Sequence, residues 1–198
     1  MSEPTQIKSK LRVKELAEVF TNEREVNAML DLVKKYSYDI EKRFFEPACG
    51  TGNFLVKILE RKLSKVKELY EHKSIEEFEF QTILAISTIY GVDICPINVK
   101  QSIARMHWKT LEHFMLSRNT ELPSKNFYKN IHYVLNKNIM HGNTLEDEDI
   151  LIFTEFTFNI KKKSFIEKKF LFKELFNDVP KPLRNTKKDK PYYKLGAR

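Results

Sequence analysis

Apolar residues follow two different spacings along residues 22–145 of the chain. Runs in which apolar positions lie three or four residues apart predict helices, and short apolar runs between them predict strands. The predicted helices lie within residues 22–33, 53–70, 75–87, 96–114 and 124–135. The predicted strands cover residues 43–47, 87–92 and 138–141. Strands that alternate with helices favour a parallel sheet covered on both faces, so we expect an α/β fold.

Beyond residue 150 the spacing of apolar residues changes to a period of two. Apolar side chains occupy the even positions Ile150, Ile152, Phe156, Phe158 and Ile160. This alternation predicts a β-strand. Three lysines, residues 161–163, separate it from a second apolar run at residues 165–172. We therefore expect a β-hairpin appended to the α/β part.

Length and composition limit the class of protein. A chain of 198 residues allows one domain of ordinary core volume. No run approaches the ~18 apolar residues of a membrane span, and no apolar stretch of a secretory signal follows the N-terminus. Cys49 and Cys95, the two cysteines, cannot make a disulfide framework. We therefore expect a cytoplasmic protein that is not attached to a membrane.

The net charge of +8 is concentrated near the C-terminus. Residues 161–198 carry 13 basic and 4 acidic groups, a net charge of +9, whereas residues 1–160 carry 22 and 23, a net charge of −1. Such a segment fits an arm that binds phosphates, which indicates DNA as a partner. A solvated tail with no partner is the alternative, and charge alone does not separate the two.

Residues 45–55 carry the strongest candidate for ligand chemistry. They read Phe-Glu-Pro-Ala-Cys-Gly-Thr-Gly-Asn-Phe-Leu, at the point where a predicted strand ends and a helix begins. Gly50 and Gly52 allow a tight turn and a close approach of the backbone to a ligand. The Lys and Ser/Thr of a P-loop and the third glycine of a dinucleotide motif are missing. Together with Glu46, which suits a cation, this favours a ligand without phosphates.

Two further loops follow the next predicted strands. Asp93 ends the second strand, where an acid can accept hydrogen bonds from ribose hydroxyls. A helix cap or a turn is the alternative role for such an aspartate. The third loop, residues 142–145, reads Gly-Asn-Thr-Leu, which is also a common turn. The five histidines show no metal-ligand spacing with cysteine, so no metal site is predicted.

The three loops resemble motifs of S-adenosylmethionine-dependent DNA adenine-N6 methyltransferases. Motif I of that family has the form Phe-x-Pro-Ala-Cys-Gly-x-Gly-x-Phe-Leu, and residues 45–55 match every named position. Residues 91–93 resemble motif II, and residues 142–145 resemble motif III with Asn143 in place of Asp. Residues 18–21 are similar to motif X. This order is the gamma-like arrangement, which is also found in modification subunits of restriction systems.

The resemblance implies S-adenosylmethionine as cofactor and a truncated Rossmann-like class I methyltransferase sheet with a C-terminal hairpin and a basic tail. Thr21 and Ala48 would contact the methionine moiety, and Glu46 would meet its ammonium group. The implied cofactor-binding residues are Thr21, Glu46, Pro47, Ala48, Cys49, Gly50, Gly52, Asn53, Phe54, Asp93, Ile94, Asn143 and Thr144.

The same resemblance implies how the adenosine part would bind and how the chain is organised. Asp93 would bind the ribose hydroxyls, Ile94 would lie against the adenine ring, and Asn143 and Thr144 would lie at the adenine edge. The implied segments are an N-terminal helical part with motif X in residues 1–42, a cofactor-binding core in 43–149, the hairpin in 150–175 and the basic tail in 176–198.

One family feature is missing. Adenine-N6 methyltransferases carry an Asn/Asp/Ser-Pro-Pro-Tyr/Phe/Trp tetrapeptide that holds the flipped adenine, and the nearest segment here is Asp189-Lys190-Pro191-Tyr192. The catalytic residues therefore stay unknown. A DNA methyltransferase, or a modification subunit that needs a second protein subunit, is one expectation. A non-catalytic, cofactor-sensing relative is the alternative, and methylation of protein or RNA is less favoured. A bacterial, phage or mobile-element origin fits the resemblance.

Overall fold

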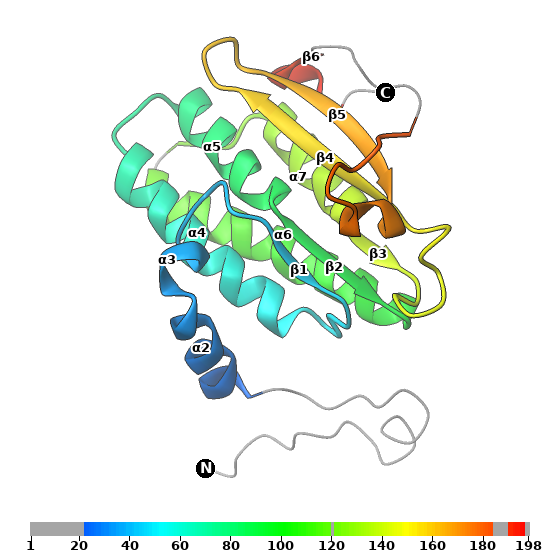
Figure 1. Ribbon diagram of the computed structural model, residues 1–198. Coiled ribbons are helices and arrows are strands. Elements are labelled where there is room, and N and C mark those ends of the chain that lie inside the picture. The colour runs from blue at the N-terminus through cyan, green and yellow to red at the C-terminus, as the bar shows by residue number, and fades with distance from the viewer. Residues whose placement is uncertain (1–21, 120, 184–189, 197–198) are drawn as a thin grey trace.

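The structure, a computed structural model, describes residues 22–119, 121–183 and 190–196. The chain is a mixed α/β protein with a three-stranded parallel sheet and a three-stranded antiparallel sheet (Figure 1). The α/β class and the parallel sheet expected from the strand and helix pattern are confirmed. Within the described residues, no helix is both long and apolar enough to cross a membrane.

The parallel sheet has the strand order β1-β2-β3, and two helices precede each of its last two strands. The strands are β1 (Phe44–Glu46), β2 (Ile89–Asp93) and β3 (Ile139–His141). The described helices are α2 (Glu23–Leu32), α3 (Lys34–Ser37), α4 (Asn53–Tyr70), α5 (Ile75–Ser87), α6 (Pro96–Arg118) and α7 (Lys125–Asn138). The three strands, α2 and the helices from α4 onward lie where the apolar spacing predicts them, within a few residues, whereas α3 is not predicted.

Helices begin where the local sequence can satisfy their first N–H groups. Asn22 forms a capping box with Glu25 at the start of α2. Ser74 and Ser124 each accept a hydrogen bond from the backbone N–H three residues on, which starts α5 and α7. Pro96 is the first residue of α6, a position where a missing N–H costs nothing.

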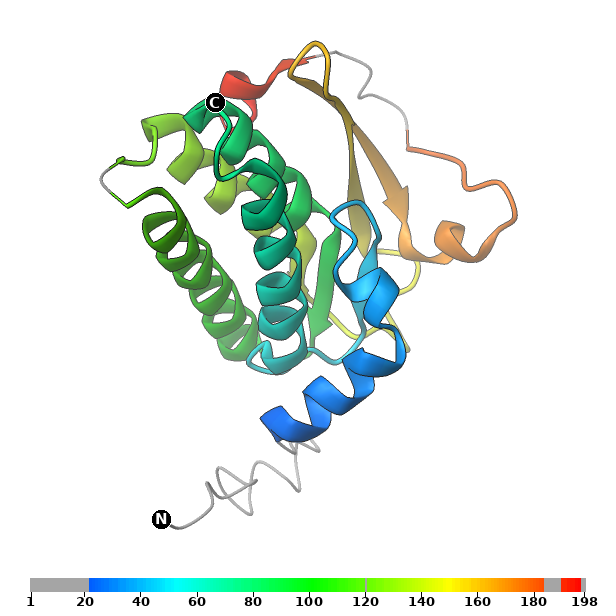
Figure 2. The same cartoon turned by 90° about the vertical axis from the view of Figure 1, so that its left-hand side faces the viewer.

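The two faces of the parallel sheet are covered differently. Ile89 and Ile139 point into the main core beneath the helices, whereas Tyr90 and Val92 belong to a smaller core with Phe153. Figure 2 shows the helices on one side of the parallel sheet and the antiparallel sheet on the other. Both faces are therefore covered, as a parallel sheet requires, but α-helices cover only one of them, and the antiparallel sheet with the short 3-10 helix η1 (Phe172–Phe176) covers the other.

The antiparallel sheet consists of β4, β5 and the short β6. They are β4 (Ile152–Asn159), β5 (Ser164–Leu171) and β6 (Lys190–Pro191). β4 and β5 form the expected hairpin, with Ile152 opposite Leu171 and Asn159 opposite Ser164.

The apolar residues at even positions in and around β4 are not all buried. Phe156 is buried and Phe158 packs against the main core, but the even-numbered Ile150, Ile152 and Ile160 are exposed. The odd-numbered Phe153 is buried instead. The second half of β4 contacts α5 and α7, whereas Phe153 contacts the parallel sheet, so the buried face changes along the strand.

Within the segment 176–198, residues 190–196 return to the core, whereas residues 176–182 are exposed. β6 pairs with β5 at Ser164 and Phe165. Tyr192 follows in a short 3-10 helix, η2 (Tyr192–Lys194), with only 4% of its surface exposed. Its ring packs on Phe80 of α5 with the centroids 5.6 Å apart. Residues near the C-terminus therefore take part in the packing of α5 and α7.

His113 of α6 makes a testable contribution to stability. Its ring stacks on Phe78, and its Nδ1 is buried without a hydrogen-bond partner among the described residues. Burial, and secondarily Lys67, lowers the pKa of His113 to about 4 from its ordinary 6.5. The stability linked to neutral His113 is then fully present above pH 6.5 and is lost as pH falls through 4. We expect this loss to reach about 3 kcal/mol.

Urea unfolding of the wild type and of His113→Phe between pH 7 and 4 measures this contribution. The variant should lose less stability than the wild type over that range, because it has no ring to protonate. His72→Phe, at an exposed site outside the core, is the matched control and should follow the wild type. Parallel pH curves for the wild type and His113→Phe would contradict the expectation.

Candidate functional site

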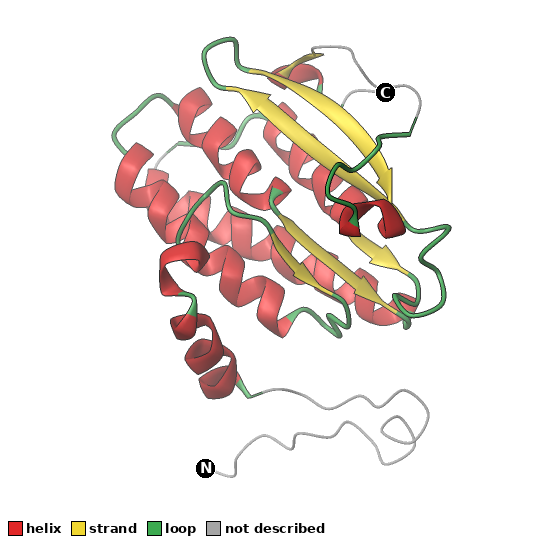
Figure 3. Cartoon of the chain, viewed as in Figure 1, coloured by secondary structure: helices red, strands yellow, loops and turns green. Residues whose placement is uncertain are grey.

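Three loops meet at the edge of the parallel sheet where its strands end. The strands end at Glu46, Asp93 and His141, and the loops that follow lie together at this edge in Figure 3. The amide of Gly142 donates to the carbonyl of Asp93 (3.1 Å), which joins the second and third loops. Because parallel strands present their carboxyl ends at one edge, the sequence-predicted loops are brought together there.

The first loop depends on its two glycines. Gly50 and Gly52 have φ angles of +54° and +87°, which side chains disfavour. A Cβ atom at Gly52 would lie 2.4 Å from Oγ of Ser102, a buried side chain on α6. The loop therefore packs its backbone directly against α6.

Asp93 links the first two loops through both carboxylate oxygens. Oδ2 accepts from the amide of Gly50 (2.7 Å). Oδ1 accepts from the amide of Cys95 (2.8 Å) and from Nδ2 of Asn98 (3.2 Å). The turn-forming role is thus present, and a carboxylate still has acceptor capacity beyond three bonds. The side chain is mostly buried, so a ligand at this edge would meet an oriented acceptor.

Glu46 and Cys49 occupy less polar surroundings. Burial raises the pKa of Glu46, and a hydrogen bond from the amide of Ala48 opposes this rise. Burial, with smaller contributions from Asp93 and Glu46, raises the pKa of the Cys49 thiol to about 12. Cys49 is therefore a neutral packing residue, and its Sγ would lie 3.1 Å from a Cβ atom at Gly91. Gly91 is needed so that the first loop can lie on β2.

The third loop is a compact turn. The amide of Leu145 donates to Oδ1 of Asn143 (3.0 Å), and the amide of Asn143 donates to Asp147 (2.7 Å). The turn-forming alternative for Asn143 is therefore observed. Thr144 Oγ1 donates to the carbonyl of Pro47 (3.4 Å), so the third loop also touches the first.

The remaining predicted residues differ in their surroundings. Ile94 is half-exposed beside Asp93, where an apolar ring could lie on it. Phe54 packs against the main core, so its side chain has a structural role. Thr21 and Asp189 lie outside the described residues. Tyr192 is a core residue of the short helix η2, and this helix lies beside β6 at the end of the molecule opposite the three loops (Figure 1).

The structure adds Arg105 of α6 to the site. Its Nη1 donates to the carbonyl of Thr51 (2.6 Å) and to Oδ1 of Asn53 (2.8 Å). These bonds hold the turn that carries Gly52 and the first residue of α4. A basic residue three turns along a helix carries no local signal of such a contact, which explains why sequence reasoning missed this role.

Comparisons with protein-family models, with curated proteins and with solved structures found no match. The fold and the site therefore define a class only in general terms. The chain is an α/β protein with three loops assembled at the carboxyl edge of a parallel sheet around a mostly buried aspartate. Any narrower assignment depends on the chemistry of these loops.

Proposed function

We propose that the chain binds S-adenosylmethionine at the carboxyl edge of the parallel sheet, as a Rossmann-like methyltransferase protein. One observation carries the proposal: Asp93 joins the glycine loop to the second loop and keeps acceptor capacity at the edge. Edges of this kind are where open α/β sheets bind nucleotide-like ligands. The match of residues 45–55 to motif I supports the same ligand.

The residues of the edge suit the three parts of this cofactor. Asp93 would accept from the ribose hydroxyls, and the half-exposed Ile94 offers an apolar surface to the adenine ring. Glu46 provides a carboxylate for the ammonium group of the methionine moiety. Gly50 and Gly52 let the backbone approach closely. The cofactor supplies an activated methyl group, so the task of the chain is to position it.

Isothermal titration calorimetry tests cofactor binding. We expect heat with both S-adenosylmethionine and S-adenosylhomocysteine, and a weakening of about 1–3 kcal/mol in Asp93→Ala, because buried ribose hydroxyls lose their acceptor. Asp178→Ala, at an exposed site, is the matched control and should bind like the wild type. A folded wild-type chain that gives no heat with either ligand at high concentration would refute the proposal.

We propose adenine in DNA as the substrate class, reached together with a second protein subunit. A cofactor-sensing protein without catalysis is the second candidate, and one observation favours it. Tyr192, the aromatic residue of the nearest tetrapeptide, has its ring against Phe80 in the core. It would have to leave the core to stack on a base at the cofactor edge. The methyltransferase candidate requires a partner subunit that supplies the aromatic ring for the base, whereas the cofactor-sensing candidate requires no such subunit.

The basic residues of 161–198 suit DNA only in part. Lys163 forms an ion pair with Glu76 (2.7 Å), and Lys173 pairs with Asp149, so some of the excess charge is balanced within the fold. The turn that carries residues 161–163 lies at the end of the molecule away from the three loops (Figure 1). DNA held by this turn would therefore need to extend along the molecule to reach the cofactor edge.

Substituting exposed lysines tests DNA binding without removing β5 or Tyr192. The triple variant Lys161→Gln, Lys162→Gln and Lys181→Gln should bind duplex DNA more weakly. Its slope of log affinity against log salt should be shallower by about three, since fewer counterions are released. The variant Lys34→Gln, Lys35→Gln and Lys125→Gln removes the same charge elsewhere and should keep the slope. Equal slopes for both triple variants would leave the segment 161–198 without a role in DNA binding.

A further inference from the structure

A cavity of about 280 Å³ lies between the β1 edge of the parallel sheet and the antiparallel sheet. Most of its lining is aromatic. The lining includes Phe45, Phe153, Phe172 and Phe176 together with Arg43 and Glu155. Its size is close to the lower end of small-ligand pockets, which suits a single ring system.

The aromatic residues form a buried floor and an open rim. Phe153 stacks on Phe172 with centroids 5.3 Å apart, and both rings are buried. Phe45, which is 40% exposed, meets the edge of Phe153 at 5.3 Å. Phe176, which is 73% exposed, meets the edge of Phe172 at 5.0 Å. Two rings therefore remain open to solvent at the entrance, where an incoming flat ring could stack on them.

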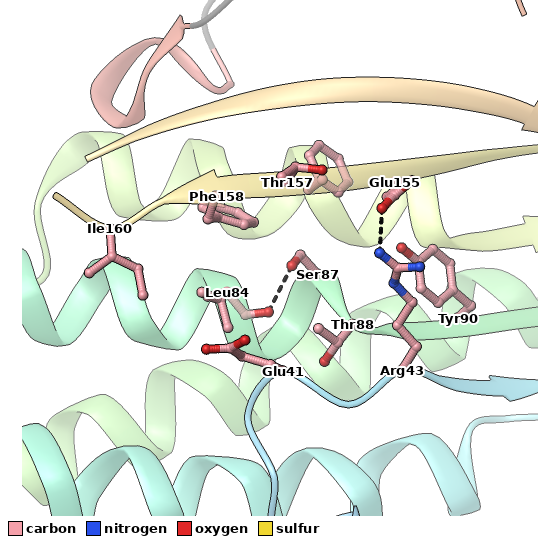
Figure 4. A pocket seen from close by; sticks show the side chains of 11 residues that line it. Glu41, Arg43, Leu84, Ser87, Thr88, Tyr90, Glu155, Thr157, Phe158 and Ile160 are labelled. Atoms are coloured by element: carbon pink, nitrogen blue, oxygen red, sulfur yellow. Dashed lines mark hydrogen bonds and ion pairs between the residues drawn. The ribbon is translucent and has the colours of Figure 1, made fainter. Parts of the chain in front are cut away.

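An ion pair stands at one wall of this cavity. Nη2 of Arg43 donates to Oε1 of Glu155, across 112 positions of sequence. Figure 4 shows the pair beside Tyr90, between β1 and β4. The same three residues also line a neighbouring, more polar cavity of about 220 Å³, which includes Glu41 and Thr157. The ion pair therefore separates an aromatic chamber from a polar one.

We propose that the aromatic chamber binds a purine ring. A flat ring could stack on the rim formed by Phe45 and Phe176, and Arg43 and Glu155 could pair with its polar edge. A purine carries both the acceptors that a guanidinium recognises and the amino or imino donors that a carboxylate recognises. Arg43 has five N–H donors. Among the described residues, its one hydrogen bond is the bond from Nη2 to Glu155, so other N–H groups can reach a ligand.

This site goes beyond the cofactor proposal and uses none of the residues implied to bind the cofactor, although Phe45 is the first residue of the 45–55 motif. A ligand that binds mainly through a phosphate group does not fit, because Glu155 already offsets the positive charge of Arg43. A purely apolar ligand would offer no hydrogen-bonding group to the ion pair of Arg43 and Glu155 at the wall of the chamber. The polar chamber on the other side of the pair offers Glu41 and Thr157, which suits the hydroxyl groups of an attached sugar.

Fluorescence titration with 2-aminopurine riboside tests the proposal, since the fluorescence of this probe falls when it stacks. We expect saturable quenching with the wild type. Phe176→Ala should weaken binding about tenfold by removing a stacking surface. Arg43→Gln should weaken it and also reduce the preference over a pyrimidine riboside in competition. Leu116→Ala, another exposed apolar site, is the control and should change nothing.

Binding of the same probe to Asp93→Ala separates this site from the cofactor edge. Retained affinity in Asp93→Ala supports the aromatic chamber, even if calorimetry finds no cofactor binding. Affinity that is lost in Asp93→Ala but kept in Phe176→Ala would place the ring at the cofactor edge and overturn the proposal. The proposal would equally be overturned if the folded wild type gave no saturable quenching.

A second arm identifies the source of the purine. The probe base is placed within a short single-stranded DNA and compared with the free riboside. Tighter binding of the riboside indicates a free nucleoside as the natural ligand, whereas tighter binding of the DNA indicates an unstacked base of a nucleic acid. In both cases Phe176→Ala must weaken binding. If it does not, the chamber is not the site.

Discussion

Lys62→Met is expected to lower the free energy of unfolding by about 3 kcal/mol at pH 7, because the carbonyls of Asp39 and Lys42 lose a donor at a cost of roughly 1–3 kcal/mol each, whereas the carbonyl of Ile40 keeps the hydrogen bond from Oγ1 of Thr88. Lys62 lies on α4 and is 0% exposed. Its Nζ donates to the carbonyls of Asp39 (2.7 Å), Ile40 (3.2 Å) and Lys42 (2.5 Å) and to Oγ1 of Thr88 (2.8 Å). A methionine fills the space and offers no donor.

The cost of Lys62→Met should grow with pH. Burial lowers the pKa of Lys62 to about 7 from its ordinary 10.5, and the nearby Asp39 only partly opposes this. Between these values the unfolded chain holds a proton that the folded chain has released. The wild type is then favoured as pH rises, by about 1.4 kcal/mol per pH unit.

Urea unfolding at pH 7 and pH 9 measures both effects. Lys65→Met on the same helix is the matched control, because the one ion pair of Lys65 with a described residue is an exposed pair with Glu68. It should stay within about 0.5 kcal/mol of the wild type at both pH values. A gap between the wild type and Lys62→Met that does not widen at pH 9 would contradict a depressed pKa.

Lys62 also matters for the aromatic chamber. The three carbonyls that it holds belong to the loop that leads directly into β1 and Arg43. Lys62 therefore fixes the path of the chain at the point where the first strand enters the sheet. The purine-binding test on Lys62→Met is interpretable only where this variant is folded, so exposed rim residues are the better probes of the chamber.

Local signals in the sequence account for much of this fold. The capping side chains Asn22, Ser74 and Ser124 start their helices as single residues can, through bonds to neighbouring N–H groups. The meeting of the glycine loop with Asp93 is also predictable, since successive parallel strands end at one edge. Both arguments need only a few residues of context or one rule of sheet geometry.

Contacts between distant segments were beyond such reasoning. The burial of Phe153 depends on which part of β4 crosses the parallel sheet, and alternation alone cannot reveal this. The pairing of Arg43 with Glu155 and the packing of Tyr192 on Phe80 join segments far apart in the sequence. The aromatic chamber is formed by such contacts, so no sequence motif predicts it.

The isolated chain is expected to transfer almost no methyl groups to DNA, even when it holds the cofactor. Transfer to adenine needs a flipped base stacked on an aromatic ring, with its amino group held near the sulfonium. Among the described residues, Tyr192 of the nearest tetrapeptide packs on Phe80 in the core and does not lie at the three loops. A displacement of even ~1 Å can cost roughly a hundredfold in rate, so a missing clamp should cost more.

The measurement is incorporation of labelled methyl groups into mixed-sequence duplex and single-stranded DNA. Asp93→Ala provides the background of a chain with an impaired cofactor edge, and the wild type should incorporate no more label than this variant. Robust multiple turnover by the wild type that Asp93→Ala abolishes would show that the chain is a complete methyltransferase. The aromatic chamber, with its exposed rings of Phe45 and Phe176, would then be the first candidate site for the target base, because a flipped base needs aromatic rings to stack on.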